Sequence, residues 1–289
     1  MVNVIIPVYH SRETLPNTLL SLLEQTTKNF FITIVNDCDG EDYTDIINKF
    51  INEGLRIIYL PLTENVGPGL ARQAAMDADN TSEFFMLCDS DDLLMPQAIE
   101  SLLRSIALKE LDIVASSFLR HEKNHNLLQD VTETAVTWCA GKIYRAEYLK
   151  KNNIRFHPYL RLNEDSYFNV VAWNSTQKRG QLKEVTVLVM DNTNSLTRKE
   201  GREKFFIKGW EQYILSQVDG LQEIYKQTLM MDPQIAARTL VYLYHETMIA
   251  MSLNLPTDQS KTYLKKLNKH WMNECMNKAE FWREIAASC

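Results

Sequence analysis

Three carboxylates stand within four residues in the segment Asp89-Ser90-Asp91-Asp92. Carboxylates this close repel one another unless a cation or solvent relieves them. Their hard oxygens suit Mg²⁺ or Mn²⁺, ions that commonly bridge protein carboxylates and substrate phosphates. The segment therefore predicts a divalent metal site. Taken alone, it is equally compatible with an acidic first turn of a helix opened by Pro96, because carboxylates favour that end of the helix dipole.

Two further pairs of polar residues could take part in chemistry. Asn36-Asp37 follows an apolar run, and Glu164-Asp165 stands at the start of a helical pattern. A carboxylate within hydrogen-bonding reach of a hydroxyl can take its proton and so act as a general base. Without further context, Glu164 and Asp165 are better explained as first-turn acids of a helix.

The first half of the chain supplies elements that would position these residues. Strand-type runs alternate with helical patterns, the former at 2–8, 31–35, 57–60, 84–88 and 111–118 and the latter near 15–23, 43–51, 67–79 and 96–108. Strands separated by single helices predict parallel βαβ units with right-handed crossovers. In open parallel sheets, ligands bind beyond the carboxyl ends of the strands, which is where Asp37 and Asp89 fall.

The remainder of the chain changes character near residue 200. Mixed short strands and loops, with helices near 145–151 and 165–174, precede three long helical patterns near 202–230, 232–254 and 258–286. We therefore predict one domain at 1–200 and a helical C-terminal region at 201–289. Helices that cannot bury their apolar stripes alone must pack on the first domain or on another subunit, so a homo-oligomer through this region is one expectation.

Composition argues against several classes of protein. The net charge of -6 over 289 residues gives no sign of a basic face, so nucleic acid is an unfavoured partner, although a local basic patch stays open. The five cysteines are scattered and form no CxxC pair, which argues against a zinc site or a disulfide framework. Reduced thiols predict a cytoplasmic protein.

Membrane association is expected to be peripheral at most. No uncharged apolar run reaches about 18 residues, so no transmembrane segment is predicted. A late helical pattern carries several lysines, for which a solvated face is the default interpretation and a membrane-surface contact the alternative. These are Lys261, Lys265, Lys266 and Lys269.

Several motifs, in order, resemble those of family 2 glycosyltransferases, which have the GT-A fold. The resemblance covers about residues 2–200 and depends on the order and spacing of the motifs more than on any one of them. On the donor side it is carried by Val4–His10, Leu19–Thr26, Val35-Asn36-Asp37, Asn65-Val66-Gly67 with Ala71-Arg72, and Asp89–Pro96. On the acceptor side it is carried by Trp138–Tyr144 and Asn163–Phe168.

The resemblance implies a fold, a reaction and a donor site. The fold would be α/β, a Rossmann-like and mostly parallel sheet flanked by helices. The reaction would move a sugar from a nucleotide-diphosphate sugar, a UDP-sugar by preference, to an acceptor hydroxyl with inversion. Asp91 would bind Mn²⁺ or Mg²⁺. The remaining nucleotide-sugar contacts would come from Pro7, Tyr9, Asp37, Arg72, Asp89 and Ser90.

On the acceptor side, the resemblance implies that Asp165 is the general base. Trp138, Glu164 and Arg198 are weaker candidates for acceptor contacts. The acceptor would be a glycan or a lipid-linked glycan, as in polysaccharide biosynthesis. The chain departs from the family pattern at Asn36, where an acidic residue is usual, and this departure bears on the choice of donor base.

Two rival functions predict different features. A nucleotidyltransferase would carry a glycine-rich, basic phosphate loop after the first strand, but the segment Pro7–Ser11 has neither glycine nor lysine. A non-catalytic protein that binds sugar nucleotides would bind donor without turnover, and the presence of Asp89, Asp91 and Asp165 argues against it.

Overall fold

The computed structural model of the protein describes residues 1–122, 127–131, 138–158 and 164–190. The chain divides into two compact units, the first formed by Met1–Phe156 with Asn163–Asn192 and the second by His157–Leu162 with Thr193–Cys289. The helical region predicted at 201–289, its boundary near residue 200 and Arg198 lie outside the described residues and stay predictions. Within the described ranges, no helix is long and apolar enough to cross a membrane.

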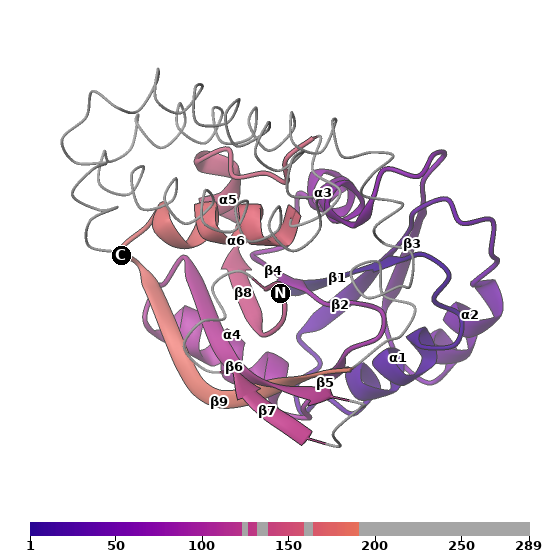
Figure 1. The fold of residues 1–289 in the computed structure, drawn as a ribbon, viewed down its shortest axis with the longest axis horizontal. Helices are drawn as coiled ribbons and strands as arrows, with labels where there is room; N and C mark the ends of the chain where they lie inside the picture. The colour runs from indigo at the N-terminus through magenta and orange to yellow at the C-terminus, as the bar shows by residue number, and fades with distance from the viewer. Residues whose placement is uncertain (123–126, 132–137, 159–163, 191–289) are drawn as a thin grey trace, which may run out of the picture. The chain divides into compact units, whose positions relative to one another are not determined.

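Parallel strands and helices alternate through the first part of the fold, as the sequence pattern predicts (Figure 1). The elements are β1 (Val2–Val8), α1 (Leu15–Leu23), β2 (Phe30–Asn36), α2 (Thr44–Asn52), β3 (Ile57–Pro61), α3 (Pro68–Ala78) and β4 (Phe84–Leu87). The strand order is β3-β2-β1-β4, and all three pairings are parallel. The carboxyl ends of β1, β2 and β4 therefore meet at one edge of the sheet.

The second part adds strands in both directions. Its elements are β5 (Leu93–Leu94), α4 (Ala98–Leu108), β6 (Ile113–Glu122), β7 (Leu127–Val131), β8 (Lys142–Arg145), α5 (Ala146–Lys151), α6 (Glu164–Asn174) and β9 (Arg179–Val189). Strand β8 lies between β4 and β6 and is antiparallel to both. The strand expected at 111–118 is therefore present as β6 but does not neighbour β4. The α/β fold class is confirmed, with a mixed sheet in which β9 is parallel to β6 and antiparallel to β5.

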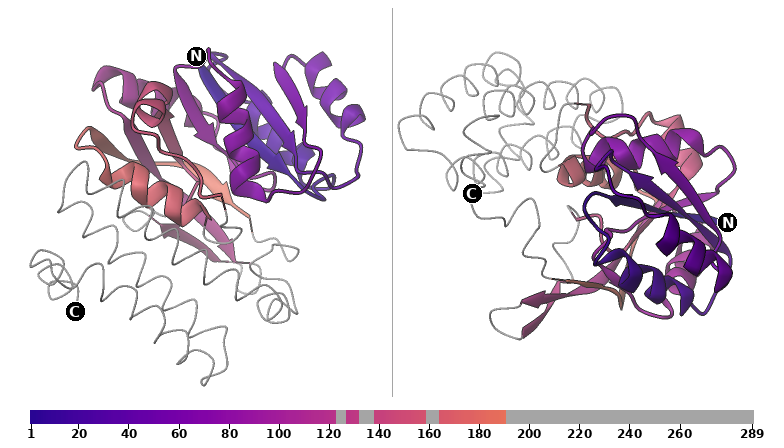
Figure 2. Two further views of the ribbon diagram at one scale, coloured as in Figure 1. Left: turned by 90° about the horizontal axis from the view of Figure 1, so that it is seen from above. Right: turned by 90° about the vertical axis from the view of Figure 1, so that its right-hand side faces the viewer.

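Helices cover both faces of the sheet. Figure 1 shows α1, α2 and α4 on one face and α3, α5 and α6 on the other, and Figure 2 shows the same layers from two further directions. Alternate residues of a strand point to opposite faces. Thus Val4, Ile6 and Val8 pack with Leu15 and Leu19 in the main core. Burying each such side chain contributes about 1.5–3 kcal/mol.

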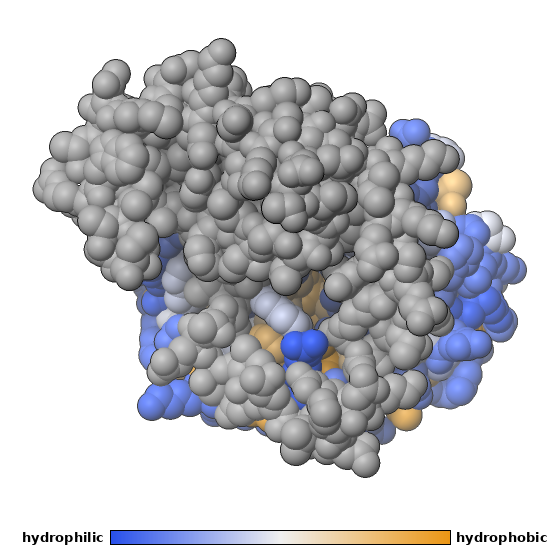
Figure 3. Space-filling view, viewed as in Figure 1, coloured by the Kyte–Doolittle hydropathy of each residue, from blue (hydrophilic) through white to orange (hydrophobic). Residues whose placement is uncertain are grey.

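The described surface is mainly hydrophilic on the face that Figure 3 shows. Large exposed hydrophobic side chains, such as Leu20, Ile51, Ile58 and Leu108, come from separate elements. Single exposed hydrophobic residues are ordinary on a globular protein. They therefore mark no docking surface in the part of the chain that the structure describes.

Asp79 joins α3 to the strands beneath it. Its Oδ1 accepts hydrogen bonds from the backbone N–H groups of Thr81 at 2.8 Å and Ser82 at 3.0 Å, and its Oδ2 accepts one from Asn3 Nδ2 at 2.9 Å. Burial raises the pKa of Asp79, but the hydrogen bonds from Ser82, Thr81 and Asn3 outweigh it and lower the pKa to about 2.

We expect Asp79→Ala to lower the free energy of unfolding by about 1–3 kcal/mol near neutral pH, because buried donors lose their partner. A carboxyl with a lowered folded-state pKa stabilises fully above its unfolded pKa, and this stabilisation is lost as the pH falls toward 2. The difference in free energy of unfolding between wild type and variant, measured by urea titration, should therefore become smaller as the pH falls from about 6 to about 3. Glu13→Ala, which removes an exposed carboxylate, is the control. A difference independent of pH would contradict the assignment.

Candidate active site

The loops after β1 and β4 are tied together at the edge of the sheet where the carboxyl ends of β1, β2 and β4 meet, which we call the donor edge because the sequence predicts donor binding there. Tyr9 follows β1 with 47% of its surface exposed, and its ring meets that of His10 at 4.4 Å. The Ser90 hydroxyl donates to Ser11 Oγ at 2.8 Å, and Ser11 Oγ donates to the Tyr9 carbonyl at 3.2 Å. Ser90 thus holds the turn that presents Tyr9. Pro7 lies half-buried at the end of β1.

Asp37 anchors a second loop at the end of β2. Only 3% of its surface is exposed. Its Oδ1 accepts the Val66 N–H at 2.7 Å, and its Oδ2 accepts the Gly67 N–H at 2.9 Å and Asn65 Nδ2 at 3.0 Å. Gly67 has φ +88°, a conformation that favours glycine. The Asp37 carboxylate already holds the 65–67 loop, so a nucleotide base that bonds to Asp37 would share the carboxylate with that loop.

Asn36, where family 2 glycosyltransferases usually have an acid, makes one hydrogen bond that a carboxylate could not make. Its Nδ2 donates to the Glu41 carbonyl at 3.2 Å and to the Tyr59 hydroxyl at 2.9 Å. Its Oδ1 accepts the Asp39 N–H at 3.3 Å. A carboxylate only accepts hydrogen bonds, so it would lose the bond to the Glu41 carbonyl, whereas the Tyr59 hydroxyl could donate to it instead. The amide therefore organises the 36–41 loop.

One group of potential metal ligands converges among the described residues, and it is not the predicted one. Side chains of His10, Asp39 and Glu41 bring ligand atoms within 4.8 Å of one another. Asp39 accepts the His10 N–H at 2.7 Å, the Glu41 N–H at 2.9 Å and the Tyr43 hydroxyl at 2.6 Å. These bonds fold the loop beside Tyr9, and they account for the group without an ion.

The carboxylates of the acidic segment have separate surroundings. Asp89 bonds to Arg72, while Asp92 is 4% exposed and accepts the Met190 N–H at 3.2 Å. Burial, together with Asp89 and Asp91, raises the pKa of Asp92 well above its usual value. Asp91 is half-buried at the donor edge. The segment thus fits Mg²⁺ or Mn²⁺ bound through one or two carboxylates and substrate phosphates, rather than an all-protein cage.

Arg72 lies beneath this edge rather than on its surface. It is 4% exposed, its Nη2 donates to Asp89 Oδ1, and its Nη1 donates to Glu164 Oε1 at 3.2 Å. Burial lowers the pKa of Arg72, but Cys139 and the carboxylates Asp89 and Glu164 outweigh it and raise the pKa. The structure thus brings together, through one guanidinium, Asp89, which the sequence predicts on the donor side, and Glu164, which it predicts on the acceptor side.

The acceptor-side acids open α6. Burial and Asp165 raise the pKa of Glu164, and Arg72 opposes them. Burial also raises the pKa of Asp165, which Arg72 and the Ser166 N–H lower. Asn169 Nδ2 donates to the Asp165 carbonyl at 2.8 Å. A carboxylate whose pKa is raised is a stronger base than an exposed aspartate, so this environment suits proton abstraction.

Lys142 is a site residue that sequence reasoning missed. It is fully buried on β8 and donates to the Trp138 carbonyl. Burial lowers its pKa to about 8, although Cys139 and Asp165 raise it. The available signal was a lysine next to the apolar pair Ile143-Tyr144 within a strand-type segment. The Trp138 ring itself packs on Phe118 at 5.3 Å, in a small core cluster.

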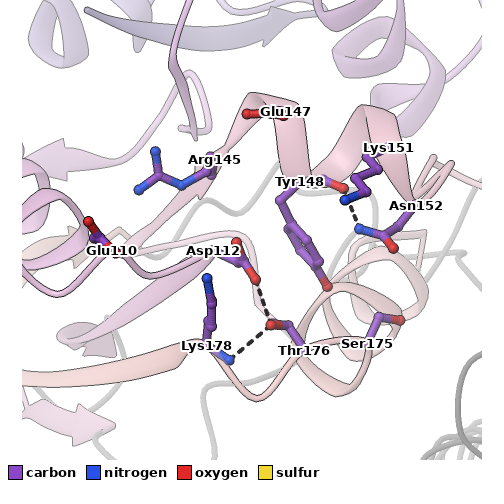
Figure 4. A pocket seen from close by; sticks show the side chains of 10 residues that line it. All are labelled: Glu110, Asp112, Arg145, Glu147, Tyr148, Lys151, Asn152, Ser175, Thr176 and Lys178. Carbon is purple, nitrogen blue, oxygen red and sulfur yellow. Dashed lines mark hydrogen bonds between the residues drawn. The ribbon is translucent and has the colours of Figure 1, made fainter.

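A cavity of about 590 Å³ lies elsewhere (Figure 4). Arg145 in its wall pairs with Phe84 at the start of β4, so the cavity is at the edge of the sheet opposite the acidic segment. None of the residues predicted for the site lines it. Acids and bases alternate in its wall, and Thr176 Oγ1 donates to Asp112 at 2.6 Å. Because acidic and basic side chains are present in equal number, the wall favours neither an anionic nor a cationic ligand.

Comparison with known proteins identifies relatives. Residues 3–171 match the profile of glycosyl transferase family 2. The uncharacterized glycosyltransferase EpsJ of Bacillus subtilis strain 168 is 26% identical over 218 residues, which are 68% of this chain and 63% of that protein. The poly(ribitol-phosphate) β-N-acetylglucosaminyltransferase TarS of Staphylococcus aureus strain Mu50 is 27% identical over 187 residues, 59% of this chain and 32% of that protein. The chain thus matches less than two thirds of these relatives' length.

Solved structures agree on the fold. The crystal structure of S. aureus TarS 1-349 in complex with UDP-GlcNAc superimposes with a TM-score of 0.76, covering 94% of this chain and 80% of that chain at 19% identity. The family profile covers more than half of the sequence, and the mixed sheet with its flanking helices superimposes on the matched structure over most of the chain. The chain belongs to glycosyl transferase family 2 and has the GT-A fold.

Proposed function

We propose that the protein transfers a sugar from a UDP-sugar to an acceptor hydroxyl with inversion at the anomeric carbon. The observation that carries the proposal is the convergence of Asp89, from the acidic segment, and Glu164, next to Asp165, on buried Arg72. This contact supports a common site in which Asp89 would bind donor and Asp165 would take the proton. The structure of TarS with UDP-GlcNAc supports a UDP-sugar as the donor class.

On the donor side, the exposed ring of Tyr9 would stack on the base above Pro7, and Asp37 would accept a hydrogen bond from it. Asp89 would contact the ribose, with Ser90 holding the loop. Asp91 would hold Mn²⁺ or Mg²⁺. Such an ion, when bound, stabilises the negative charge that develops on the leaving diphosphate.

On the acceptor side, Asp165 would accept the proton of the attacking hydroxyl as its oxygen bonds to the anomeric carbon. The bond from that carbon to the diphosphate breaks, and its electron pair leaves with UDP. One displacement with one base inverts the configuration. Trp138, Glu164 and Arg198 would lie near the acceptor, a glycan, lipid-linked glycan or similar hydroxyl-rich polymer, as the name of TarS suggests.

Cytoplasmic action is part of the proposal. Cys38, Cys88 and Cys139 are free thiols, in keeping with a reducing compartment. A peripheral membrane contact and an oligomer through the C-terminal region stay predictions from the sequence.

The donor class is tested by thermal shift with Mn²⁺ and a panel of UDP, GDP, ADP and their sugars. A ligand at about 100 times its Kd stabilises the folded state by about 2.7 kcal/mol. We expect uridine compounds to raise Tm most, through Tyr9 and Asp37. Calorimetry that shows a clear preference for GDP would overturn the uridine assignment.

We expect Asp91→Ala to abolish transfer and the Mn²⁺-dependent part of UDP binding while Tm stays close to that of wild type, because the residue is half-buried at a loop. Calorimetry of UDP with Mn²⁺ and with EDTA measures the effect. Glu53→Ala, another carboxylate removal at an exposed position, should bind and turn over normally. Full activity of Asp91→Ala in EDTA would refute the metal assignment.

We expect Asp165→Asn to bind donor as wild type does and to turn over about 10² to 10⁴ times more slowly, since the amide keeps the shape but cannot take the proton. In the wild type, kcat should fall as the pH falls through the Asp165 pKa, which burial raises above its ordinary value. NMR of the product should show inversion. Retention of configuration, or wild-type turnover in the variant, would exclude this mechanism.

A further inference from the structure

Arg72 links two carboxylates that lie far apart in the sequence. Its two Nη atoms each bond to a different carboxylate, and its Nε is buried with no hydrogen-bond partner in the part of the chain that the structure describes. The guanidinium also lies 5.9 Å from the Phe156 ring centre. A side chain with 4% exposure cannot lie along a diphosphate without leaving these contacts.

The contact between α3 and α6 is built around Glu164. A Cβ added to Gly69, one turn before Arg72, would lie 2.6 Å from Glu164 Cγ and 3.0 Å from Phe156 Cδ1. Phe156 in turn stacks on Phe168 of α6 at 4.2 Å. Glycine at position 69 therefore lets the first turn of α6 approach α3 until Glu164 reaches Arg72.

We propose that Arg72 and Glu164 are positioning residues, which hold the first turn of α6, and with it Asp165, in register with the loop that carries Asp89 and Asp91. The proposal rests on the proposed function, because it takes Asp165 as the base. In this proposal, the position of Asp165 depends on the loop that carries Asp89, through the guanidinium of Arg72.

The same contact sets the charge around Asp165. Arg72 favours the ionised form of Asp165, so its removal should raise the proton affinity of the base. The charged or titratable groups that act on Asp165 or border it come from three helices and strands, from the loop after β4 and from the loop before β8. They are Arg72 on α3, Asp89 after β4, Lys142 on β8, Glu164 on α6 and Cys139.

Four variants and a control test the proposal. Arg72→Gln removes the charge, and Arg72→Lys keeps the charge but replaces the two separated Nη donors by one compact ammonium. Glu164→Gln keeps the shape, and Gly69→Ala displaces Glu164 without changing any charge. Gly180→Ala is the matched control, because its Cβ would meet Leu111 Cδ1 at the same 2.6 Å, away from the site. UDP binding with Mn²⁺ is measured by calorimetry, and turnover by UDP release from the UDP-sugar that the panel selects. Thermal melts show which variants fold.

For all four variants we expect kcat to fall by about 10- to 100-fold, since a displacement of about 1 Å can cost that much, while the Kd of UDP stays within about threefold. In Arg72→Gln alone, the acid limb of the kcat profile should move to higher pH. Gly180→Ala should turn over as wild type does.

The opposite pattern would overturn the proposal. If Arg72→Gln weakens UDP binding tenfold or more while Gly69→Ala and Glu164→Gln turn over normally, Arg72 is a donor ligand. Should Arg72→Gln fail to fold, Gly69→Ala and Glu164→Gln still decide the matter. Normal turnover in Asp165→Asn would instead refute the base assignment, which is a separate failure.

Discussion

A buried cation among carboxylates is the constraint on which the site depends. Taking a guanidinium out of water costs several kcal/mol, and the cost is recovered only when its hydrogen bonds are made in good geometry. Arg72 meets that demand through Asp89 and Glu164, which come from the end of β4 and the start of α6. Loss of either carboxylate would leave the buried guanidinium with one of its two partners missing. Helix α3, the acidic loop and the first turn of α6 are therefore constrained as one unit.

The surrounding charge explains the chemistry that this unit can support. Five carboxyl groups, Asp89, Asp91, Asp92, Glu164 and Asp165, share the region with two buried bases, Arg72 and Lys142, among the described residues. Burial and mutual repulsion raise the pKa of Asp92, Glu164 and Asp165. An excess of negative charge favours a divalent cation on the donor side, and the raised pKa of Asp165 favours a base on the acceptor side.

The donor edge shows how loops acquire rigidity from a few side chains. Asp37 holds the 65–67 loop through three hydrogen bonds, and Ser90 holds the Tyr9 turn through Ser11. Asn36, which departs from the family pattern, donates a hydrogen bond to the Glu41 carbonyl that a carboxylate could not donate. Ligand-binding loops hold their shape through hydrogen bonds of this kind. The change from an acid to Asn36 therefore acts directly on the shape of the 36–41 loop and only indirectly on which nucleotide base is bound.

Local sequence determined the elements and the kinds of chemistry. Apolar periodicity predicted the parallel strands and helices through residue 108, and the order of the motifs predicted family 2 and the GT-A fold, because both signals lie within short segments. Tertiary structure decided which segments are neighbours. The insertion of β8 beside β4, the pairing of β9 with β5 and β6, the burial of Lys142 and the turning of Arg72 toward Glu164 all join residues far apart in the chain. The choice of neighbouring strands and of charge partners depends on such long-range contacts, which short segments of sequence do not encode.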